Sequence, residues 1–288
     1  MTAHELDPLI LAFYRDRYVE DERLTRTPHG QLEFVRTQQL LRRHLPPAPA
    51  AVVDVGGGTG VHARWLAADG YQVQLVDPVA EHVDRARAIV GVQASVGDAR
   101  ALAMADSSVA VSLLLGPLYH LVDERDRGRA LAEAVRVTRP GGLVVAAAIS
   151  RYAALLELAA LGELDEDAGA HVAQLIETGI NDDDPEGFTT AYFHRPEQLA
   201  AELTGAGLTD ITVFGVEGPS VPALDGAGLS RFDELMPSAA RCAEMVETDP
   251  AMINASPHFL AVGRRASVVA VVQSSTPRAT SASPRRSA

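Results

Sequence analysis

The sequence contains no lysine, so all 25 of its Lys and Arg positions are arginine. This absence excludes a P-loop, which places a lysine on the nucleotide phosphates, and a pyridoxal phosphate site, which needs a lysine Schiff base. The single cysteine, Cys242, excludes an intramolecular disulfide framework and a cysteine-rich zinc site. Such sparse cysteine use is typical of a reducing compartment, and we expect a cytoplasmic protein.

Long apolar runs and excess positive charge are also absent. No apolar run approaches the ~20 residues that a helix needs to span a bilayer, so we expect no membrane partner. Acids and arginines interrupt the first residues, MTAHELDPLILAFYRDRYVED, which we do not expect to be a secretory signal. The formal net charge of -13 argues against a nucleic acid as the main partner.

The first half of the chain shows helix-like and then alternating patterns. Apolar spacings of three and four residues predict helices between residues 5 and 45, and PPAPA at 46–50 ends them. Strands are then predicted at 51–55, 72–76, 92–95, 109–115 and 143–149, with helices at 60–69, 79–90 and 124–138. This alternation predicts an α/β fold with a parallel sheet and helices on both faces.

The second half departs from that alternation. Residues 151–180 read as helical, followed by a helix at 196–206, a strand at 209–216, mixed loop and helix at 219–257, and a last strand at 257–265. The end of the chain is rich in Ser, Pro and Arg and lacks acids, which predicts disorder, with a basic nucleic-acid arm as the alternative. We therefore divide the chain into a helical cap (1–45), a main domain (46–264) with an inserted lid (151–190), and a disordered tail (265–288).

The stretch VVDVGGGTGVHARWLA, residues 52–67, concentrates four glycines between a predicted strand and a predicted helix. A strand, a glycine-rich turn and a helix N-terminus together form an anion or nucleotide site. The dinucleotide fingerprint would need a small residue where Val61 stands, which disfavours a nicotinamide-dependent oxidoreductase. The spacing of Asp54, Gly56, Gly58 and Gly60 instead satisfies acid-x-Gly-x-Gly-x-Gly.

This motif resembles the first motif of class I S-adenosylmethionine-dependent methyltransferases of the small-molecule type. Four further segments keep that family's order over roughly residues 30–264: VQLVDPVAEHVDRAR, SVGDARAL, VSLLLGPLYHLVDERDRGRALAEAVRVTRPGG and FHRPEQLAAELTGAGLTDITVFG. The resemblance implies a Rossmann-like, doubly wound, mostly parallel seven-stranded sheet with a helical N-terminal cap and a lid insertion. It also implies S-adenosylmethionine as the cofactor.

The resemblance also implies roles for individual residues at the cofactor. The glycines would let the loop pass under the methionine moiety and the ribose, while Asp54 would hold the loop or meet the ammonium group. Asp77 would accept hydrogen bonds from the ribose hydroxyls, and Asp98 from the adenine amino group. The expected cofactor residues are Asp54, Gly56, Gly58, Gly60, Asp77, Pro78, Asp98, Ala99 and Leu115. Each acid alone could equally be a turn residue or a helix cap.

Past the cofactor, the segment GPLYHL places Tyr119 and His120 directly after the fourth predicted strand, where they should face the methyl group. His120 suits a general base, although it could instead pack or bind the carboxylate end of the cofactor. Tyr192 and His194 share one strand face and are expected in the acceptor pocket, unless His194 only leads into the next helix. Tyr18 is expected in a lid.

Other polar residues are expected to have no role in the site. His62, His82 and His171 fall in helical stretches and should lie on the surface. The acids of NDDDPEG, at 181–187, are expected to form a solvated loop, and no metal site is expected.

The resulting expectation is in-line methyl transfer to a nitrogen or oxygen of a small-molecule acceptor, by a monomer or homodimer. GPLY stands where nucleic-acid amino methyltransferases of this family carry Asn/Asp-Pro-Pro-Tyr/Phe. The alternatives are a nicotinamide-dependent oxidoreductase and a non-catalytic protein that binds S-adenosylmethionine.

Overall fold

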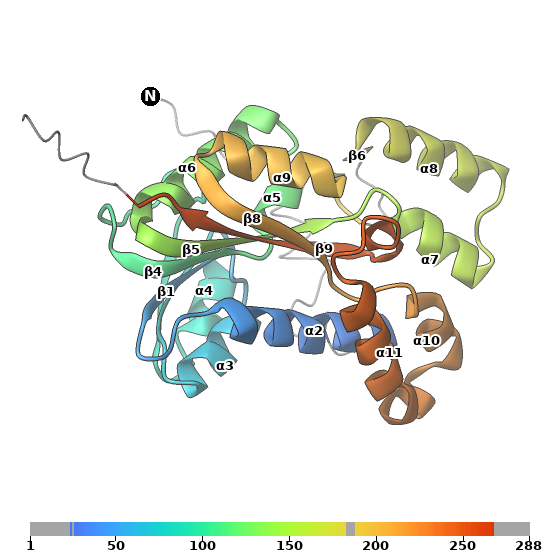
Figure 1. Ribbon diagram of the computed structural model, residues 1–288, viewed down its shortest axis with the longest axis horizontal. Helices are drawn as coiled ribbons and strands as arrows, with labels where there is room; N and C mark the ends of the chain where they lie inside the picture. The colour runs from blue at the N-terminus through green and yellow to red at the C-terminus, as the bar shows by residue number, and fades with distance from the viewer. Residues whose placement is uncertain (1–23, 25, 183–187, 268–288) are drawn as a thin grey trace, which may run out of the picture.

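One twisted sheet organises the chain in the computed structural model, which describes residues 24, 26–182 and 188–267 (Figure 1). Its seven strands lie in the order β3-β2-β1-β4-β5-β9-β8. Their bounds are β1 Ala51–Val55, β2 Gln72–Asp77, β3 Val92–Val96, β4 Val109–Leu114, β5 Thr138–Ile149, β8 Leu208–Gly215 and β9 His258–Arg265. The expected seven-stranded α/β fold is confirmed.

The sheet is parallel except at one edge. Strands β3, β2, β1, β4 and β5 pair in parallel, and β9 runs antiparallel to both β5 and β8. The chain order reverses between β1 and β4, so the connections leave toward opposite faces at that point. A crevice forms at the carboxyl ends of strands beside such a switch point, which predicts the position of a ligand.

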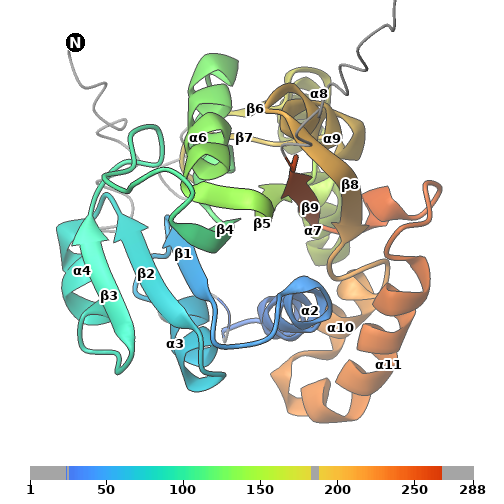
Figure 2. The ribbon, with the colours of Figure 1, turned by 60° about the vertical axis from the view of Figure 1, so that its left-hand side comes forward.

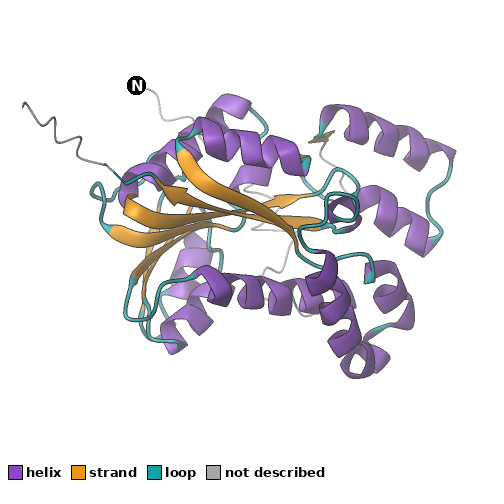
Figure 3. Cartoon of the chain, viewed as in Figure 1, coloured by secondary structure: helices purple, strands orange, loops and turns teal. Residues whose placement is uncertain are grey.

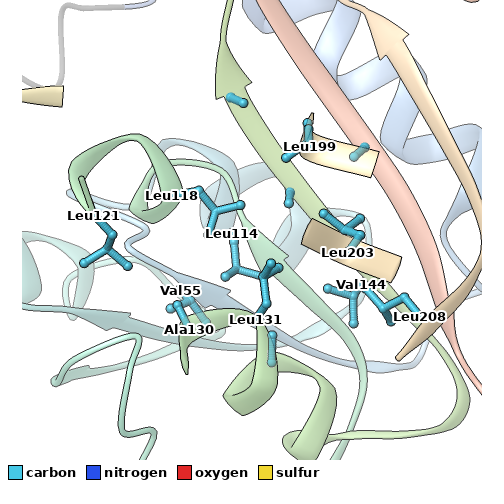
Figure 4. Close-up of a cluster of buried hydrophobic side chains, with 14 of the residues drawn as sticks. Val55, Leu114, Leu118, Leu121, Ala130, Leu131, Val144, Leu199, Leu203 and Leu208 are labelled. Atoms are coloured by element: carbon cyan, nitrogen blue, oxygen red, sulfur yellow. The ribbon is translucent and has the colours of Figure 1, made fainter. Parts of the chain in front are cut away.

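Helices cover both faces (Figure 2). Helices α6 (Glu124–Val137) and α9 (Pro196–Gly205) lie on one face, and α2 (Pro28–His44), α3 (Val61–Ala68) and α4 (Ala80–Ala86) on the other. Figure 4 shows the core beneath α6 and α9, where buried leucines of both helices meet the sheet. Because the two cores bury opposite faces of the same strands, the sheet cannot shift without disturbing both.

Local signals explain where the main helices begin. The Thr27 hydroxyl accepts a hydrogen bond from the Gly30 N–H, and Pro28 occupies the first turn of α2. The Asp123 carboxylate caps α6 through the Arg125 N–H, and Asp165 caps α8 (Glu166–Thr178) through Ala168. These side chains satisfy amide groups that a helix leaves unpaired at its N-terminus.

Some of the segments after β5 lie beyond one end of the sheet. Helices α7 (Ala153–Leu161) and α8 lie there, with α10 (Val221–Ala227) and α11 (Phe232–Val246) beside the start of α2 (Figure 1). The remaining short elements are α5 Pro117–His120, β6 Ile180–Asn181, β7 Ala191–Tyr192, η3 Leu229–Arg231 and η4 Ile253–Ala255. Among the described residues, no helix has the length and apolar character needed to cross a membrane.

Three boundaries differ by more than one residue from those expected from the sequence. β5 begins at Thr138 rather than 143, because Thr138 already pairs with Val109 before a register shift. α4 ends at Ala86 rather than 90, and residues 87–90 form turns that lead to Gly91, whose φ is +84°. The helical segment 151–180 is two helices, because Gly162 ends α7 at a φ of +75°.

A buried arginine joins α2 to the rest of the molecule. Arg36 is 1% exposed and donates to the Val216 carbonyl, to Gln39 and to the Glu247 carboxylate. Burial raises the pKa of Glu247, but hydrogen bonds from Arg43 and Arg36 more than offset this and leave its pKa below the usual value. α2 is therefore anchored by a paired, hydrogen-bonded buried charge.

Replacing Arg36 should test this anchor. We expect Arg36→Ala to lower the free energy of unfolding by about 3–5 kcal/mol, because it removes the buried side chain and leaves the Val216 carbonyl and part of the Glu247 carboxylate without their donor. The exposed pair of Arg42 with Asp69, also on α2, provides a matched control, and Arg42→Ala should cost at most about 1 kcal/mol. Urea unfolding measures both, and equal small losses would show that Arg36 does not anchor α2.

Candidate functional site

A cavity opens at the carboxyl ends of β1 to β5, and about 1120 Å³ of empty space lies within it and at its open mouth. Its walls include most of the expected cofactor residues, namely Asp54, Gly56, Gly58, Asp77, Pro78, Asp98, Ala99 and Leu115. Tyr119 and His120 also line it, so residues from four separate strand ends meet around one space.

The glycine loop between β1 and α3 forms the floor of the cavity. Gly56 and Gly58 have positive φ angles of +67° and +56°, and a Cβ on Gly56 would lie 2.7 Å from Pro117 Cγ. Only glycine fits such a turn without strain. Gly60 caps α3 at a φ of +90° but is not among the described wall residues, since it packs toward Ile89.

Asp77, at the end of β2, holds this loop in place. Its carboxylate accepts a hydrogen bond of 2.8 Å from the Gly58 N–H and one of 2.9 Å from the Val79 N–H. His82 Nδ1 lies 3.4 Å from the same carboxylate. Because a carboxylate has two acceptor oxygens with several lone pairs, Asp77 keeps capacity for a further donor from the cavity.

Asp54, at the end of β1, differs from Asp77 because it accepts no hydrogen bond from the described residues. It is 1% exposed, and neither carboxylate oxygen has a hydrogen-bond partner among the described residues. Burial raises the pKa of Asp54 to about 7, and the nearby Asp77 charge adds to this effect. A buried carboxyl group that lines a cavity without a partner favours a ligand that brings a positive charge or strong donors.

Arg100 fixes the orientation of Asp98, which lines the cavity after β3. Arg100 binds both oxygens of Asp98 and also reaches Asp126 at 2.7 Å. Burial raises the pKa of Asp98, but the hydrogen bonds from Arg100 outweigh it and leave the pKa below its usual value. Asp98 is therefore a negatively charged acceptor held in one orientation beside Ala99.

Aromatic rings line the remaining wall. Tyr119 and His120 belong to the single-turn helix α5, and their ring centroids lie 4.6 Å apart. Phe188 lies 6.4 Å from Tyr119 and 5.9 Å from His120. α5 follows β4 directly, so both residues lie beside the glycine loop, where the sequence placed them.

Tyr192 and His194 are together but are not among the residues described as lining this cavity. Their rings meet at 4.7 Å, which agrees with one shared strand face. Arg127 stacks on Tyr192 at 3.8 Å, and His194 Nε2 lies 3.4 Å from Glu202 on α9. Burial lowers the pKa of His194, which is fully enclosed. Tyr18 lies outside the described residues.

The sequence missed several wall residues. The surface expectation for His62 and His82 was wrong, because both line the cavity and His82 is only 6% exposed. Glu33 and Thr37 reach the cavity from α2. Their spacing could have predicted this, because Glu33 and Thr37 stand four residues apart on the helix face that also carries the buried Leu40 and Leu41.

Comparison with known proteins shows that this sequence is similar to methyltransferases. Residues 52–142 match the family model described as a methyltransferase domain. The chain is 34% identical over 154 residues to an uncharacterised methyltransferase of Mycobacterium tuberculosis, covering 53% of this chain and 59% of that protein. It is 38% identical over 148 residues to a ubiquinone/menaquinone biosynthesis C-methyltransferase of Acidiphilium cryptum, covering 45% and 56%. The chain thus matches under two thirds of these relatives' length.

Solved structures support the fold. An S-adenosylmethionine-dependent methyltransferase of Thermotoga maritima, described as a possible histamine N-methyltransferase, superposes with a TM-score of 0.55 at 19% identity, covering 89% of this chain and 99% of that one. A second, from Methanosarcina mazei, gives 0.54 at 16% identity, covering 79% and 97%. Residues 52–142 therefore match a methyltransferase domain, and the chain shares the fold of these S-adenosylmethionine-dependent methyltransferases.

Proposed function

We propose that the chain binds S-adenosylmethionine in this cavity and transfers its methyl group to a small-molecule acceptor. The observation that supports this most directly is Asp54, a buried carboxyl group that lines the cavity without a hydrogen-bond partner in the described chain. S-adenosylmethionine carries an ammonium group and a sulfonium centre. A ligand ammonium at Asp54 would supply both the missing donors and the missing positive charge.

The other walls fit the rest of the cofactor. The Gly56–Gly58 turn leaves no side chain between the backbone and a ligand, which suits the methionine moiety and the ribose. Asp77 has acceptor capacity for the ribose hydroxyls, and the oriented Asp98 with the Ala99 N–H suits the adenine edge. When bound, S-adenosylmethionine supplies a methyl group already activated by the positive sulfur.

The acceptor is proposed to be a small molecule with a nitrogen or oxygen nucleophile. The net charge of -13 argues against a nucleic acid as the acceptor. The Thermotoga relative is named for a possible N-methylation and the Acidiphilium relative for a C-methylation, and both names refer to small molecules. Tyr119 and His120 would contact the acceptor, because they line the wall directly after β4.

Two measurements test this proposal. Calorimetry should detect binding of S-adenosylhomocysteine and none of NADH. Transfer of tritium from methyl-labelled S-adenosylmethionine should then be followed with histamine, tyramine and 1,4-naphthohydroquinone, which offer amine, phenol and ring-carbon nucleophiles. Binding of NADH alone would support an oxidoreductase, and cofactor binding without any transfer would favour a non-catalytic binding protein.

Asp54→Asn should separate stability from binding. The raised pKa means that folded Asp54 holds a proton below pH ~7, so its contribution to stability is present at low pH and is lost as pH rises. Between pH 5.5 and 8 the free wild type should lose about 2 kcal/mol of unfolding free energy that Asp54→Asn does not lose.

The same variant should bind S-adenosylhomocysteine about tenfold or more weakly, since a charged hydrogen bond to the ligand is lost. Urea unfolding and calorimetry measure the two effects, and Asp167→Asn on the exposed surface of α8 is the control. If the stability of Asp54→Asn depends on pH as that of the wild type does, a group other than Asp54 causes this dependence.

Asp77→Ala should weaken S-adenosylmethionine binding by roughly 1.5–3 kcal/mol, because it removes hydrogen bonds to a charged group. It also releases the Gly58 N–H, so the loss should lie toward the upper end of that range. The exposed Asp84 of α4, changed to alanine, is the matched control and should bind normally. Calorimetry that finds unchanged affinity for Asp77→Ala would remove it from the site.

His120→Ala should mainly weaken acceptor binding, because His120 shapes the wall with Tyr119 and Phe188. We expect a higher acceptor KM, unchanged cofactor affinity and an unchanged pH profile, with His171→Ala on α8 as the control. A ~10²–10⁴-fold loss of turnover would identify His120 as the general base instead, provided that the rise of rate with pH near the pKa of imidazole is lost as well.

A further inference from the structure

A buried arginine contacts the end of the short helix that carries Tyr119 and His120. Arg127 belongs to α6 and is 3% exposed, and its Nη1 atom donates to the Leu121 carbonyl at 2.9 Å and to the Val122 carbonyl at 2.8 Å. Leu121 follows α5 directly and itself lines the cavity. The guanidinium therefore holds the backbone at the point where α5 ends.

The same guanidinium lies against an aromatic ring from a distant part of the chain. Arg127 Cζ lies 3.8 Å from the centroid of the Tyr192 ring on β7, and its Nε donates to the Glu202 carboxylate of α9 at 2.8 Å. A planar guanidinium can stack on a ring while its N–H groups donate in its own plane, which a lysine ammonium cannot do. Arg127 thus joins the end of α5 to β7 and α9 through a single side chain.

Tyr192 extends this contact to the inserted helices. Its hydroxyl accepts a hydrogen bond of 3.0 Å from Arg151, which follows β5 and is 4% exposed. Arg151 also donates to the carbonyls of the last turn of α8, those of Ile176, Glu177 and Thr178. A cation at a helix C-terminus satisfies carbonyl groups that the helix leaves unpaired. A continuous series of contacts therefore runs from α8 through Arg151 and Tyr192 to the guanidinium on α6 and the end of α5.

Neither side chain of this stack belongs to the described walls of the cavity. Arg127 and Tyr192 are not among the lining residues, whereas α5 lines the cavity and also packs against α6 and β7. Leu118 of α5 is fully buried in the core that α6 covers. The described contacts of the stack thus reach the cavity wall through α5, so the two side chains influence a bound acceptor by where they hold that helix.

We propose that Arg127, stacked on Tyr192, is a positioning residue that fixes α5 and thereby sets how tightly the acceptor binds against Tyr119 and His120. This inference rests on the proposed function, in which those two residues contact the acceptor, and makes it more specific. Because Arg127 holds backbone carbonyls, a displacement of the end of α5 moves both side chains together. Loss of the stack therefore weakens acceptor binding, while the cofactor floor that Asp77 holds stays in place.

The first measurement needs no acceptor. In ¹H–¹⁵N spectra of histidine-labelled protein with S-adenosylhomocysteine bound, the His120 ring signal is assigned by its loss in His120→Gln. The signal depends on the ring current of Tyr119, whose centroid lies 4.6 Å away, so it reports a displacement within α5. Arg127→Lys and Tyr192→Leu should both move it, and Arg129→Lys on the exposed side of α6 should not. An unmoved His120 signal in both variants would overturn the proposal.

The second measurement uses whichever of histamine, tyramine and 1,4-naphthohydroquinone is methylated. Arg127→Lys keeps a positive charge beside Glu202 but loses the planar stack, and it should raise the acceptor KM about tenfold. Tyr192→Phe keeps the stacked ring and should raise KM less than about threefold, whereas Tyr192→Leu should match Arg127→Lys. Affinity for S-adenosylhomocysteine should be that of the wild type in all three variants, and Arg129→Lys should leave both constants unchanged.

A double variant tests whether Arg127 acts through α5. In the His120→Ala background, Arg127→Lys should raise KM by less than about threefold, because a side chain that it positions is already absent and effects on one shared element do not add. An increase as large as the one in the wild-type background would show that Arg127 affects the acceptor by another route, and would overturn the proposal.

The remaining outcomes each decide the matter. An unchanged KM together with lower stability in urea would show that Arg127 only stabilises the fold, and an equal loss of S-adenosylhomocysteine affinity would show that it supports the whole cavity. Either result would overturn the proposal. If Arg127→Lys fails to fold, the two Tyr192 variants decide. Absence of transfer to all three acceptors despite S-adenosylhomocysteine binding would contradict the proposed function, and the His120 spectra would still show whether Arg127 positions α5.

Discussion

The hydrogen bonds from the Gly58 and Val79 amides to Asp77 are the interaction on which the rest of the site depends. They tie the glycine loop after β1 to the end of β2, and so set the floor of the cavity against its side wall. The positive φ angles of Gly56 and Gly58 permit that approach, and no other residue type would adopt them without strain. A carboxylate acceptor at the end of β2 thus orients the neighbouring backbone.

That arrangement leaves the second acid of the site without a partner. Asp77 takes the nearby amides, while Asp54, buried one strand away, takes none that the structure describes. Burial and the Asp77 charge raise the pKa of Asp54 to about 7, so the free protein retains an unfavourable group that a cationic ligand would stabilise. The unpaired carboxyl group lowers the stability of the free protein, and binding of a cationic ligand would recover that free energy. Such destabilising groups are common at functional sites.

The first half of the fold could be predicted from sequence because its signals are local. Apolar residues before Asp54 and Asp77 marked β1 and β2, and the glycines between strand and helix marked the loop. The second half was less predictable. Alternation correctly placed Tyr192 and His194 on one face, but it could not report that Arg127 and α9 cover that face. His82 sits in a short amphipathic helix whose inner side happens to meet the cavity.

The sequence by itself therefore determined the α/β sheet, the glycine turn, and the acids and aromatic pair that follow the strands. Each of these depends on backbone conformation or on residues within one strand–turn–helix unit, where spacing reports position. Only the tertiary structure decided that α2 brings Glu33 and Thr37 to the cavity, and that Arg127 stacks on Tyr192. These contacts join residues far apart in the chain, and no periodicity records such a meeting, because it depends on how helices and strands pack in three dimensions.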